Sequence, residues 1–281
     1  MPDSHRAGRR GAIACTAALA GFAGCAAAGT RPASPAGAAP VETVRVSLPS
    51  GATDVDLYRP GAALPAPLVV VAHGFSRSRR NMSGWGRCLA REGYVVAVPD
   101  LPAWSDPARN GRFVSELRAY LTAVEPFRGE VDGSRVGLVG FSAGGLATLL
   151  SAAEDPPPAI WVGLDPVDRD GLGARAAARV RCPAVVLTAE PSACNAHGNV
   201  RGILGALRAC ELSPVPGAVH VDAEAPTSWL AEVVCGRSTQ ARREEFFERA
   251  TRALRATLST QPVPARAGDE EVTWRRRART W

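Results

Sequence analysis

Short apolar runs alternate with longer amphipathic stretches along most of this chain. The apolar runs have a length and continuity typical of strands covered on both faces, and they occupy residues 68–72, 95–98, 136–140, 160–164 and 184–188. The segments expected to be helical lie near 80–92, 112–125, 143–154, 171–179 and 199–210. Strands that alternate with helices predict a mostly parallel sheet with helices on both faces.

The two ends of this pattern differ from its middle. Residues 43–48 and 54–59 alternate with period two around Pro49-Ser50-Gly51, which predicts an antiparallel hairpin. A short strand is expected at 214–219, and two helices near 226–235 and 239–259 complete the pattern. We therefore predict one α/β domain over residues 41–260, without a large lid, because only about 18 residues separate Asp168 from the next strand. Residues 261–281 are expected to form a disordered, arginine-rich tail.

The first 40 residues have the composition of an export segment. Three arginines precede an apolar stretch from Gly11 to Gly24, which predicts a signal peptide over residues 1–24. This stretch is shorter than the roughly 20 apolar residues that a membrane-spanning helix needs. Residues 25–40 are almost entirely alanine, glycine and proline, and they are expected to form a flexible tether.

The predicted signal ends in Phe22-Ala23-Gly24-Cys25, which resembles a bacterial lipoprotein box. In that interpretation Cys25 is lipidated and the protein is exported to the cell envelope. The lipid anchor is then the one expected contact with a membrane. Cleavage after Cys25, which leaves a secreted protein, is the alternative. Arg9-Arg10 leaves open whether export uses the general or the twin-arginine route.

Composition and charge change this picture little. The chain of 281 residues is 46% hydrophobic and 21% charged, as expected for a folded globular protein. Its net charge of +6 comes from arginines that are scattered outside the two ends. Because nucleic-acid-binding proteins gather such charge on one face or helix, no nucleic-acid partner is expected. We expect a monomer.

Export would place five cysteines in an oxidising compartment, where disulfides persist. They are Cys88, Cys182, Cys194, Cys210 and Cys235. Cys194 with Cys210 is the preferred pair, although connectivity cannot be deduced from sequence. None of these cysteines has zinc-ligand spacing, so neither a metal nor another cofactor is expected.

The segment Gly140-Phe141-Ser142-Ala143-Gly144 lies between a predicted strand and a predicted helix. A nucleophile elbow has this Gly-x-Ser-x-Gly pattern, because glycines on both sides of the serine let strand and helix approach closely. Ser142 is therefore the candidate nucleophile. Its hydroxyl would stand at the carboxyl edge of the sheet, where open α/β sheets bind their ligands.

An oxyanion site is expected next to this turn. The strand at 68–72 runs into His73-Gly74-Phe75-Ser76. In a nucleophile-elbow enzyme one oxyanion donor is a backbone N–H of this loop and the other follows the nucleophile. Phe75 and Ala143 are the candidate donors, and His73 is interpreted as a residue that shapes the loop.

The base and the acid must come later in the chain. His220 follows a predicted strand and precedes a helix, so it is favoured as the base over His197, which lies in a polar loop. Asp165 stands at the end of the strand at 160–164 and is the favoured acid. Glu190 is the second candidate for the acid, and Asp168 is the third.

These motifs, in this order, resemble the α/β-hydrolase superfamily, and within it chlorophyllases and the bacterial hydrolases grouped with them. The resemblance covers about residues 65–235, and its most specific part is Leu164-Asp165-Pro166-Val167-Asp168. It implies that Ser142, Asp165 and His220 are nucleophile, acid and base. Plant chlorophyllases carry His and Arg around the serine, so chlorophyll is not the expected substrate. Bacterial polyester hydrolases place an aspartate after the next strand, so close membership among them is not expected either.

The sequence thus predicts an exported serine hydrolase that cleaves a small-molecule or polymeric carboxylic ester through an acyl-enzyme intermediate. Trp104 and Phe141 are expected to line an open substrate site, and Trp161 is a further candidate. Two alternatives remain: acyl transfer to another alcohol at the same site, and a catalytically silent binding lipoprotein on a hydrolase scaffold.

Overall fold

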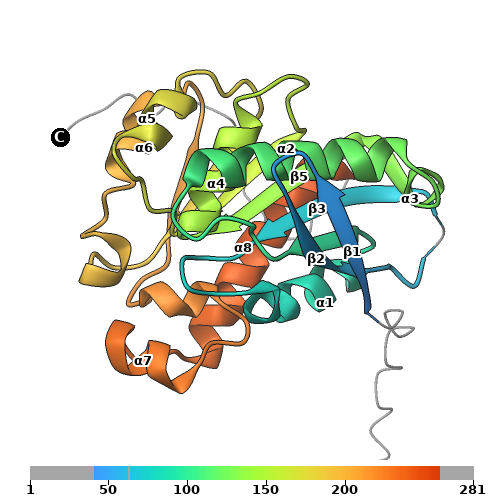
Figure 1. Cartoon of the computed structure of the whole chain (residues 1–281). Coiled ribbons are helices and arrows are strands. Elements are labelled where there is room, and N and C mark those ends of the chain that lie inside the picture. Colours follow the sequence, from blue (N-terminus) through green and yellow to red (C-terminus); the bar gives the residue numbers. More distant parts are fainter. Residues whose placement is uncertain (1–40, 63, 260–281) are drawn as a thin grey trace, which may run out of the picture. The chain divides into compact units, whose positions relative to one another are not determined.

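The structure is a computed structural model that describes residues 41–62 and 64–259. The predicted signal peptide at 1–24, Cys25, the tether at 25–40 and the tail at 261–281 lie outside these residues. The described chain is built around one sheet with strand order β1-β2-β4-β3-β5-β6-β7-β8 (Figure 1). β1 pairs with β2 and β2 with β4 in antiparallel fashion, and the remaining neighbours are parallel.

The strands are β1 (Glu42–Leu48), β2 (Gly51–Tyr58), β3 (Ala66–Ala72), β4 (Val95–Pro99), β5 (Val131–Phe141), β6 (Ile160–Leu164), β7 (Ala184–Thr188) and β8 (Glu211–Pro214). The α-helices are α1 (Ser83–Arg91), α2 (Pro107–Ala123), α3 (Phe127–Glu130), α4 (Ala143–Ala152), α5 (Leu172–Ala177), α6 (Arg201–Ala206), α7 (Trp229–Cys235) and α8 (Gln240–Leu258). Three 3₁₀ turns are η1 (Arg79–Met82), η2 (Ala193–Asn195) and η3 (His220–Ala223).

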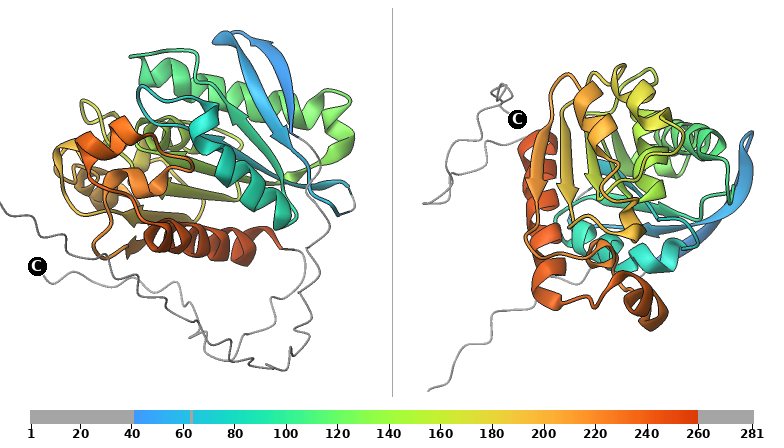
Figure 2. Two further views of the ribbon diagram at one scale, coloured as in Figure 1. Left: turned by 90° about the horizontal axis from the view of Figure 1, so that it is seen from below. Right: turned by 90° about the vertical axis from the view of Figure 1, so that its left-hand side faces the viewer.

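Helices cover both faces of the sheet, and each face has its own apolar core. Alternate residues of β3 point to opposite faces, so Leu68 and Val70 belong to one core while Val69 and Val71 belong to the other. The first core is covered by α2, α4, α5 and α6, and the second by α1 and α8. Figure 2 shows α8 lying along its face of the sheet. This layering confirms the predicted fold class.

The N-terminal hairpin and the five buried strands are confirmed. The predicted runs at 160–164 and 184–188 coincide with β6 and β7, and the others lie inside β3, β4 and β5. The strand expected at 214–219 is wrong, because the strand there is β8, which ends at Pro214. β8 is the last strand of the sheet and is half exposed, so it shows no apolar run.

The helices differ from the predictions mainly at their ends. α2 begins at Pro107, five residues before the expected start, because Asp106 caps the helix by accepting a hydrogen bond from the Arg109 N–H. The helix expected at 199–210 ends at Ala206, and the short α3 had no counterpart among the predictions.

The disulfide joins Cys194 to Cys235 and not to Cys210, so the preferred pairing was wrong. Cys194 lies in η2 after β7, where α7 packs against it with a Cα–Cα distance of 5.7 Å between the two cysteines. Cys210 lies instead at the start of β8, where its thiol approaches the carbonyl of Glu211. Burial raises the pKa of the Cys210 thiol to about 12, so this cysteine is a poor nucleophile.

The short helix α7 exposes an apolar face. Ala231 is the one buried residue of α7, and the disulfide ties the last residue of the helix to η2. Four large apolar side chains on α7 are between 57% and 76% exposed: Trp229, Leu230, Val233 and Val234. Their spacing of three and four residues places them on one side of the helix. None of the helices in the described ranges has the length and apolar character that would let it span a membrane.

Candidate active site

Ser142 sits in a sharp turn between β5 and α4. Its backbone has φ of +54° and ψ of −119°, a strained conformation for a residue with a side chain. A Cβ on Gly140 would lie 2.3 Å from the Gly144 carbonyl oxygen, and one on Gly144 would lie 2.3 Å from the His73 carbonyl oxygen. Only glycine therefore allows the strand, the turn and the β3 loop to approach this closely.

Ser142, His220 and Asp165 form a continuous hydrogen-bonded chain. The Ser142 Oγ lies 3.0 Å from His220 Nε2, and His220 Nδ1 lies 2.6 Å from Asp165 Oδ2. Because a carboxylate only accepts hydrogen bonds, Nδ1 carries the hydrogen and Nε2 can accept the serine proton. All three side chains are buried, with residue exposures of 7% or less. The arrangement can activate the serine hydroxyl as a nucleophile.

The Asp165 carboxylate is almost fully buried but well supplied with hydrogen bonds. Its Oδ1 accepts from the Ala189 N–H at 3.1 Å, and its Oδ2 accepts from Asn195 Nδ2 at 3.0 Å as well as from His220. Three N–H donors compensate a buried negative charge that would otherwise be costly. Ala189 directly follows β7, so the ends of β6 and β7 both contribute to holding this carboxylate.

The loop after β3 lies against the Ser142 turn. A Cβ on Gly74 would lie 2.9 Å from the Phe141 ring and 3.2 Å from the Ser142 Cβ, so the backbone next to Phe75 is close to the serine. His73 accepts a hydrogen bond from the Leu101 N–H at Nε2 and therefore donates from Nδ1 to the Gly74 carbonyl. Burial lowers the pKa of His73, which favours this neutral form.

A buried ion pair connects this loop to the segment that carries His220. Arg77 Nε donates to Glu224 Oε1 at 2.6 Å, and Arg77 also donates to Ser76 Oγ. Among the described residues, Oε2 of Glu224 has no hydrogen-bond partner. Burial raises the pKa of the Glu224 carboxyl, and the neighbouring Arg77 acts against that rise.

The reserve acids and the second histidine lie elsewhere. The Glu190 carboxylate accepts from the Gly217 N–H, and Asp168 accepts from the Gly173 and Ala174 N–H groups near the start of α5. His197 is exposed in the loop after η2. Asp165 is therefore the acid that the structure brings to the imidazole of His220.

The two residues expected to line a substrate site have different surroundings. Trp104 is 70% exposed and packs edge to face on Phe75, with ring centroids 4.9 Å apart. Phe141 is only 1% exposed, and its ring lies 4.7 Å from the His220 imidazole. Phe141 thus supports the histidine from beneath instead of forming an open wall. Trp161 is also fully buried and donates a hydrogen bond to Thr148.

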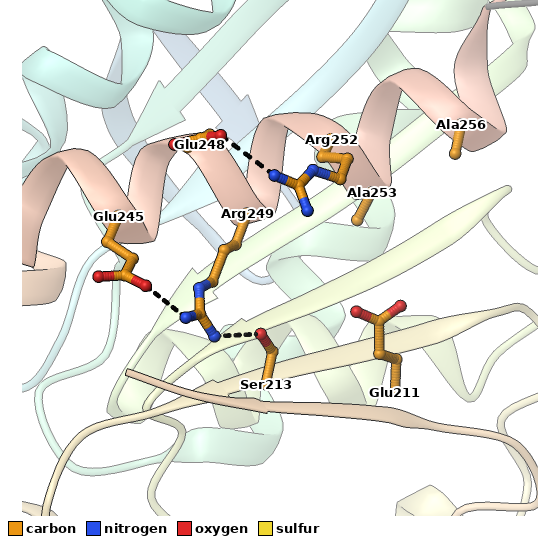
Figure 3. Close-up of a pocket in the computed structure, with 8 residues that line it drawn as sticks. All are labelled: Glu211, Ser213, Glu245, Glu248, Arg249, Arg252, Ala253 and Ala256. Atoms are coloured by element: carbon orange, nitrogen blue, oxygen red, sulfur yellow. Dashed lines mark hydrogen bonds and ion pairs between the residues drawn. The ribbon is translucent and has the colours of Figure 1, made fainter. Parts of the chain in front are cut away.

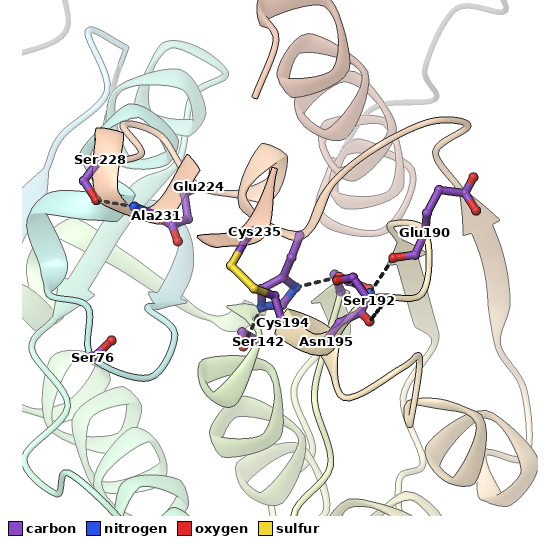
Figure 4. Close-up of a disulfide and its surroundings, with 12 residues drawn as sticks. Ser76, Ser142, Glu190, Ser192, Cys194, Asn195, Glu224, Ser228, Ala231 and Cys235 are labelled. Atoms are coloured by element: carbon purple, nitrogen blue, oxygen red, sulfur yellow. Dashed lines mark hydrogen bonds and ion pairs between the residues drawn. A yellow bond between two sulfur atoms is a disulfide. The ribbon is translucent and has the colours of Figure 1, made fainter. Parts of the chain in front are cut away.

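Two residues at this site were missed by sequence reasoning. Asn195 contacts Asp165, and Asp222 anchors the His220 turn by accepting hydrogen bonds from Ser238, Thr239 and Arg242. Figure 4 shows Asn195 and Ser142 close to the Cys194–Cys235 disulfide. The short spacing from His220 was the available signal for Asp222, and no local pattern marks Asn195.

A separate hollow of about 340 Å³ lies between β8 and α8. Arg249 spans it, donating to Glu245 on its own helix and to Ser213 on β8 (Figure 3). None of the residues around Ser142 lines this hollow. Within 41–62 and 64–259, no three His, Cys, Asp or Glu side chains are grouped to hold a metal ion.

Comparison with protein families gives a match over more than half of this chain. A family model described as "PET hydrolase-like" matches residues 23–199, which include β1 to β7 and the Ser142 turn. The expectation that the chain stands apart from polyester hydrolases is therefore wrong. That expectation rested on the missing aspartate after β7, but Asp165 at the end of β6 reaches the same imidazole.

Two characterised relatives match part of the chain. The bis(hydroxyethyl) terephthalate hydrolase of Streptomyces coelicolor is 34% identical over 103 residues, which are 36% of this chain and 33% of that protein. The quorum-quenching protein AidA of Acinetobacter baumannii is 30% identical over 106 residues, 35% of each chain. The chain spans about a third of the length of the curated relatives it matches.

Among solved structures, the dienelactone hydrolase from Anabaena variabilis superimposes with a TM-score of 0.63. It is 20% identical, and the match covers 78% of this chain and 99% of that one. This similarity confirms the α/β-hydrolase fold. The superfamily resemblance that the motifs indicated is borne out by the family match over residues 23–199.

Proposed function

Because this chain belongs to the PET hydrolase-like family, we propose that it is an exported serine hydrolase that cleaves carboxylic esters through an acyl-enzyme intermediate. One observation carries this proposal: the unbroken chain of contacts from Ser142 Oγ through the His220 imidazole to the Asp165 carboxylate. An ester hydrolase of this type needs these three groups in this order.

The first half of the reaction forms the acyl-enzyme. His220 Nε2 takes the proton of Ser142 Oγ as the oxygen attacks the ester carbonyl carbon. Asp165 keeps the imidazole oriented and stabilises its positive form. The backbone N–H groups of Phe75 and Ala143 bind the oxygen that becomes negative, and the first turn of α4 favours negative charge there. The tetrahedral intermediate then collapses, and the alcohol leaves with the proton from His220.

The second half releases the acid. Water enters the place of the alcohol, and His220 takes one of its protons as the oxygen attacks the acyl carbonyl. The second tetrahedral intermediate collapses, the C–O bond to Ser142 breaks, and Ser142 regains its proton from His220. If another alcohol takes the place of water, the same steps transfer the acyl group.

An open apolar rim supports a bulky ester as the substrate. Phe75 is 54% exposed and stacks with the exposed Trp104 beside the Ser142 turn. The chain between β6 and β7 carries only the six-residue helix α5, so no lid domain arises there. The similarity to a bis(hydroxyethyl) terephthalate hydrolase supports an ester of an aromatic acid as the first substrate to test.

Purified protein should be assayed with p-nitrophenyl esters of increasing acyl length and with bis(hydroxyethyl) terephthalate, beside Ser142→Ala. Loss of the nucleophile should lower kcat by roughly 10⁴- to 10⁶-fold. Activity that survives in Ser142→Ala would contradict the serine mechanism. Product analysis in the presence of a second alcohol separates hydrolysis from acyl transfer.

Export and lipidation at Cys25 form part of the same proposal. The Cys194–Cys235 disulfide supports an oxidising compartment. Mass spectrometry of the mature N-terminus in a bacterial host should find a diacylglyceryl group on Cys25. An unmodified chain that starts further along would instead indicate a secreted protein.

A further inference from the structure

We propose that Asn195 is a positioning residue that holds the Asp165 carboxylate toward His220, an inference that rests on the proposed function. Asn195 Nδ2 donates to Asp165 Oδ2 at 3.0 Å, and the same oxygen lies 2.6 Å from His220 Nδ1. Asn195 and Asp165 are each 1% exposed. The amide therefore acts, with little solvent present, on the very oxygen that orients the imidazole.

The four hydrogen bonds of the Asn195 amide fix its orientation. Its Oδ1 accepts from the N–H groups of Ser192 and Gly198, at 2.8 and 3.1 Å. Its Nδ2 donates to the Glu190 carbonyl at 2.9 Å and to Asp165. A primary amide has two donor hydrogens and two acceptor lone pairs, so this set saturates it. A flipped amide would place its oxygen against two other acceptors, which excludes the opposite orientation.

The backbone around Asn195 is also held in place. Asn195 is the last residue of η2, and the preceding Cys194 is bonded to Cys235 at the end of α7. α7 follows the His220 turn in the chain. The disulfide therefore links the loop that contacts Asp165 to the segment that carries His220. Figure 4 shows Cys194, Cys235 and Asn195 grouped beside Ser142.

An amide is suited to this position for an electrostatic reason. Asp165 is a buried carboxylate. A neutral amide donor stabilises its negative charge and adds no second charge next to the imidazole. A carboxylate at position 195 would place two negative groups about 3 Å apart next to the imidazole. Asp165 thus follows β6, while the loop after β7 carries the Asn195 amide that holds its carboxylate.

Two variants and a matched control test this role. Asn195→Ala removes the amide, and Asn195→Asp keeps acceptors for the Ser192 and Gly198 N–H groups while it removes the donor. Asn199→Ala is the control, because Asn199 lies in the same loop and forms two hydrogen bonds to the backbone of Asp168. We expect Asn195→Ala to lower kcat by about 10- to 100-fold with little change in KM, and Asn199→Ala to stay within about threefold.

The pH profile separates positioning from loop stability. In Asn195→Asp two buried carboxyl groups about 3 Å apart share one proton, and loss of that proton as pH rises adds a negative charge beside the imidazole, so the pH profile of kcat/KM should change shape relative to the wild type. The two charged pairs at the His220 turn, Asp222 with Arg242 and Glu224 with Arg77, are the same in both proteins. An unchanged profile in Asn195→Asp, or equal losses in Asn195→Ala and Asn199→Ala, would overturn the proposal.

A readout that needs no substrate distinguishes failure of this inference from failure of the proposed function. The His220 Nδ1–H, hydrogen-bonded to a carboxylate, should give a far-downfield proton NMR signal that disappears in His220→Ala. We expect this signal to shift or broaden in both Asn195 variants and to remain in Asn199→Ala. If no ester is hydrolysed but the signal depends on Asn195, the positioning role stands and the function fails. A signal indifferent to Asn195 would overturn the positioning role even in an active esterase.

Discussion

The turn that carries Ser142 and the loop that carries Asn195 lie at the same carboxyl edge of the sheet, but different contacts hold them. At the Ser142 turn, backbone packs on backbone: carbonyl oxygens of Gly144 and His73 occupy the space where side chains would be. In the Asn195 loop, one side-chain amide and one disulfide hold the backbone in position. The first arrangement depends on the absence of side chains, and the second on particular ones.

This difference predicts different tolerance to substitution. A Cβ added at the turn must displace backbone, which a packed interior resists. A side chain changed in the loop removes hydrogen bonds but leaves the path of the strands intact. We therefore expect changes at the turn to act on folding and activity together, and changes to the Asn195 side chain to act mainly on activity.

The largest expected effect tests whether the loop after β7 contributes the catalytic acid or only holds it in position. Asp165→Asn should lower kcat by about 10⁴-fold, because a neutral amide neither holds the imidazole in the required tautomer nor stabilises the imidazolium that forms. Glu190→Gln, in the loop after β7, should stay within about twofold, since its carboxylate contacts Gly217. Steady-state kinetics on one ester decide this. Equal losses, or a larger loss at Glu190, would contradict the assignment of Asp165.

The next effect concerns the turn itself. Gly144→Ala should destabilise the protein by about 3 kcal/mol or more, because the new Cβ would lie 2.3 and 2.5 Å from the carbonyl oxygens of His73 and Ala72. Gly205→Ala in α6 is the control, because a Cβ there meets nothing within 4 Å and alanine favours a helix. Urea unfolding measures both variants. A Gly144→Ala protein as stable as the wild type would contradict the claim that the Ser142 turn depends on the absence of a side chain at this position.

The disulfide should matter less than the turn. Replacing both Cys194 and Cys235 by serine opens a link between residues 41 positions apart, which should cost roughly 2–4 kcal/mol. Activity should fall as well, because Asn195 follows Cys194 directly. Cys88→Ser, at a half-buried free cysteine, is the control. A double variant with the stability and kcat of this control would mean that the loop holds its position without the disulfide.

The smallest effect concerns pH and the ion pair between Arg77 and Glu224. Burial raises the pKa of the Glu224 carboxyl above the value near 4.5 that it has in the unfolded chain. The folded protein therefore binds the carboxyl proton of Glu224 more tightly than the unfolded chain does. The resulting stability is present below pH 4.5 and is lost as pH rises through the raised pKa. The Tm of the wild type relative to Glu224→Gln should therefore fall between pH 4.5 and pH 8. Glu248→Gln, whose side chain is 72% exposed, should show no such trend.

Much of the fold could be predicted because its signals are local. The runs that became β6 and β7 are apolar along their whole length, since both of their faces are buried. β8 gave no such signal, because Glu211, Ser213 and Pro214 belong to a half-exposed strand at the edge of the sheet. Ser142 was identifiable for a related reason, since the glycines that permit its turn lie two residues before and two residues after it.

The parts that escaped prediction depend on contacts between distant segments. The partner of Cys194 follows from the packing of α7 on η2, which no spacing of cysteines reveals. Asn195 lies 30 residues from Asp165, and an asparagine in a polar loop has no periodic pattern that marks it. Phe141 adjoins Ser142 in the sequence, but only the fold shows that its ring packs against the His220 imidazole.

The exposed face of α7 has a practical consequence for handling the protein. Trp229, Leu230, Val233 and Val234 project from a helix held by one disulfide and one buried alanine. Such a patch adsorbs to apolar materials. We therefore expect dilute samples to lose protein to untreated plastic tubes and hydrophobic resins. A non-ionic detergent in the buffer, or serine at positions 229 and 233, should keep the enzyme in solution at assay concentrations.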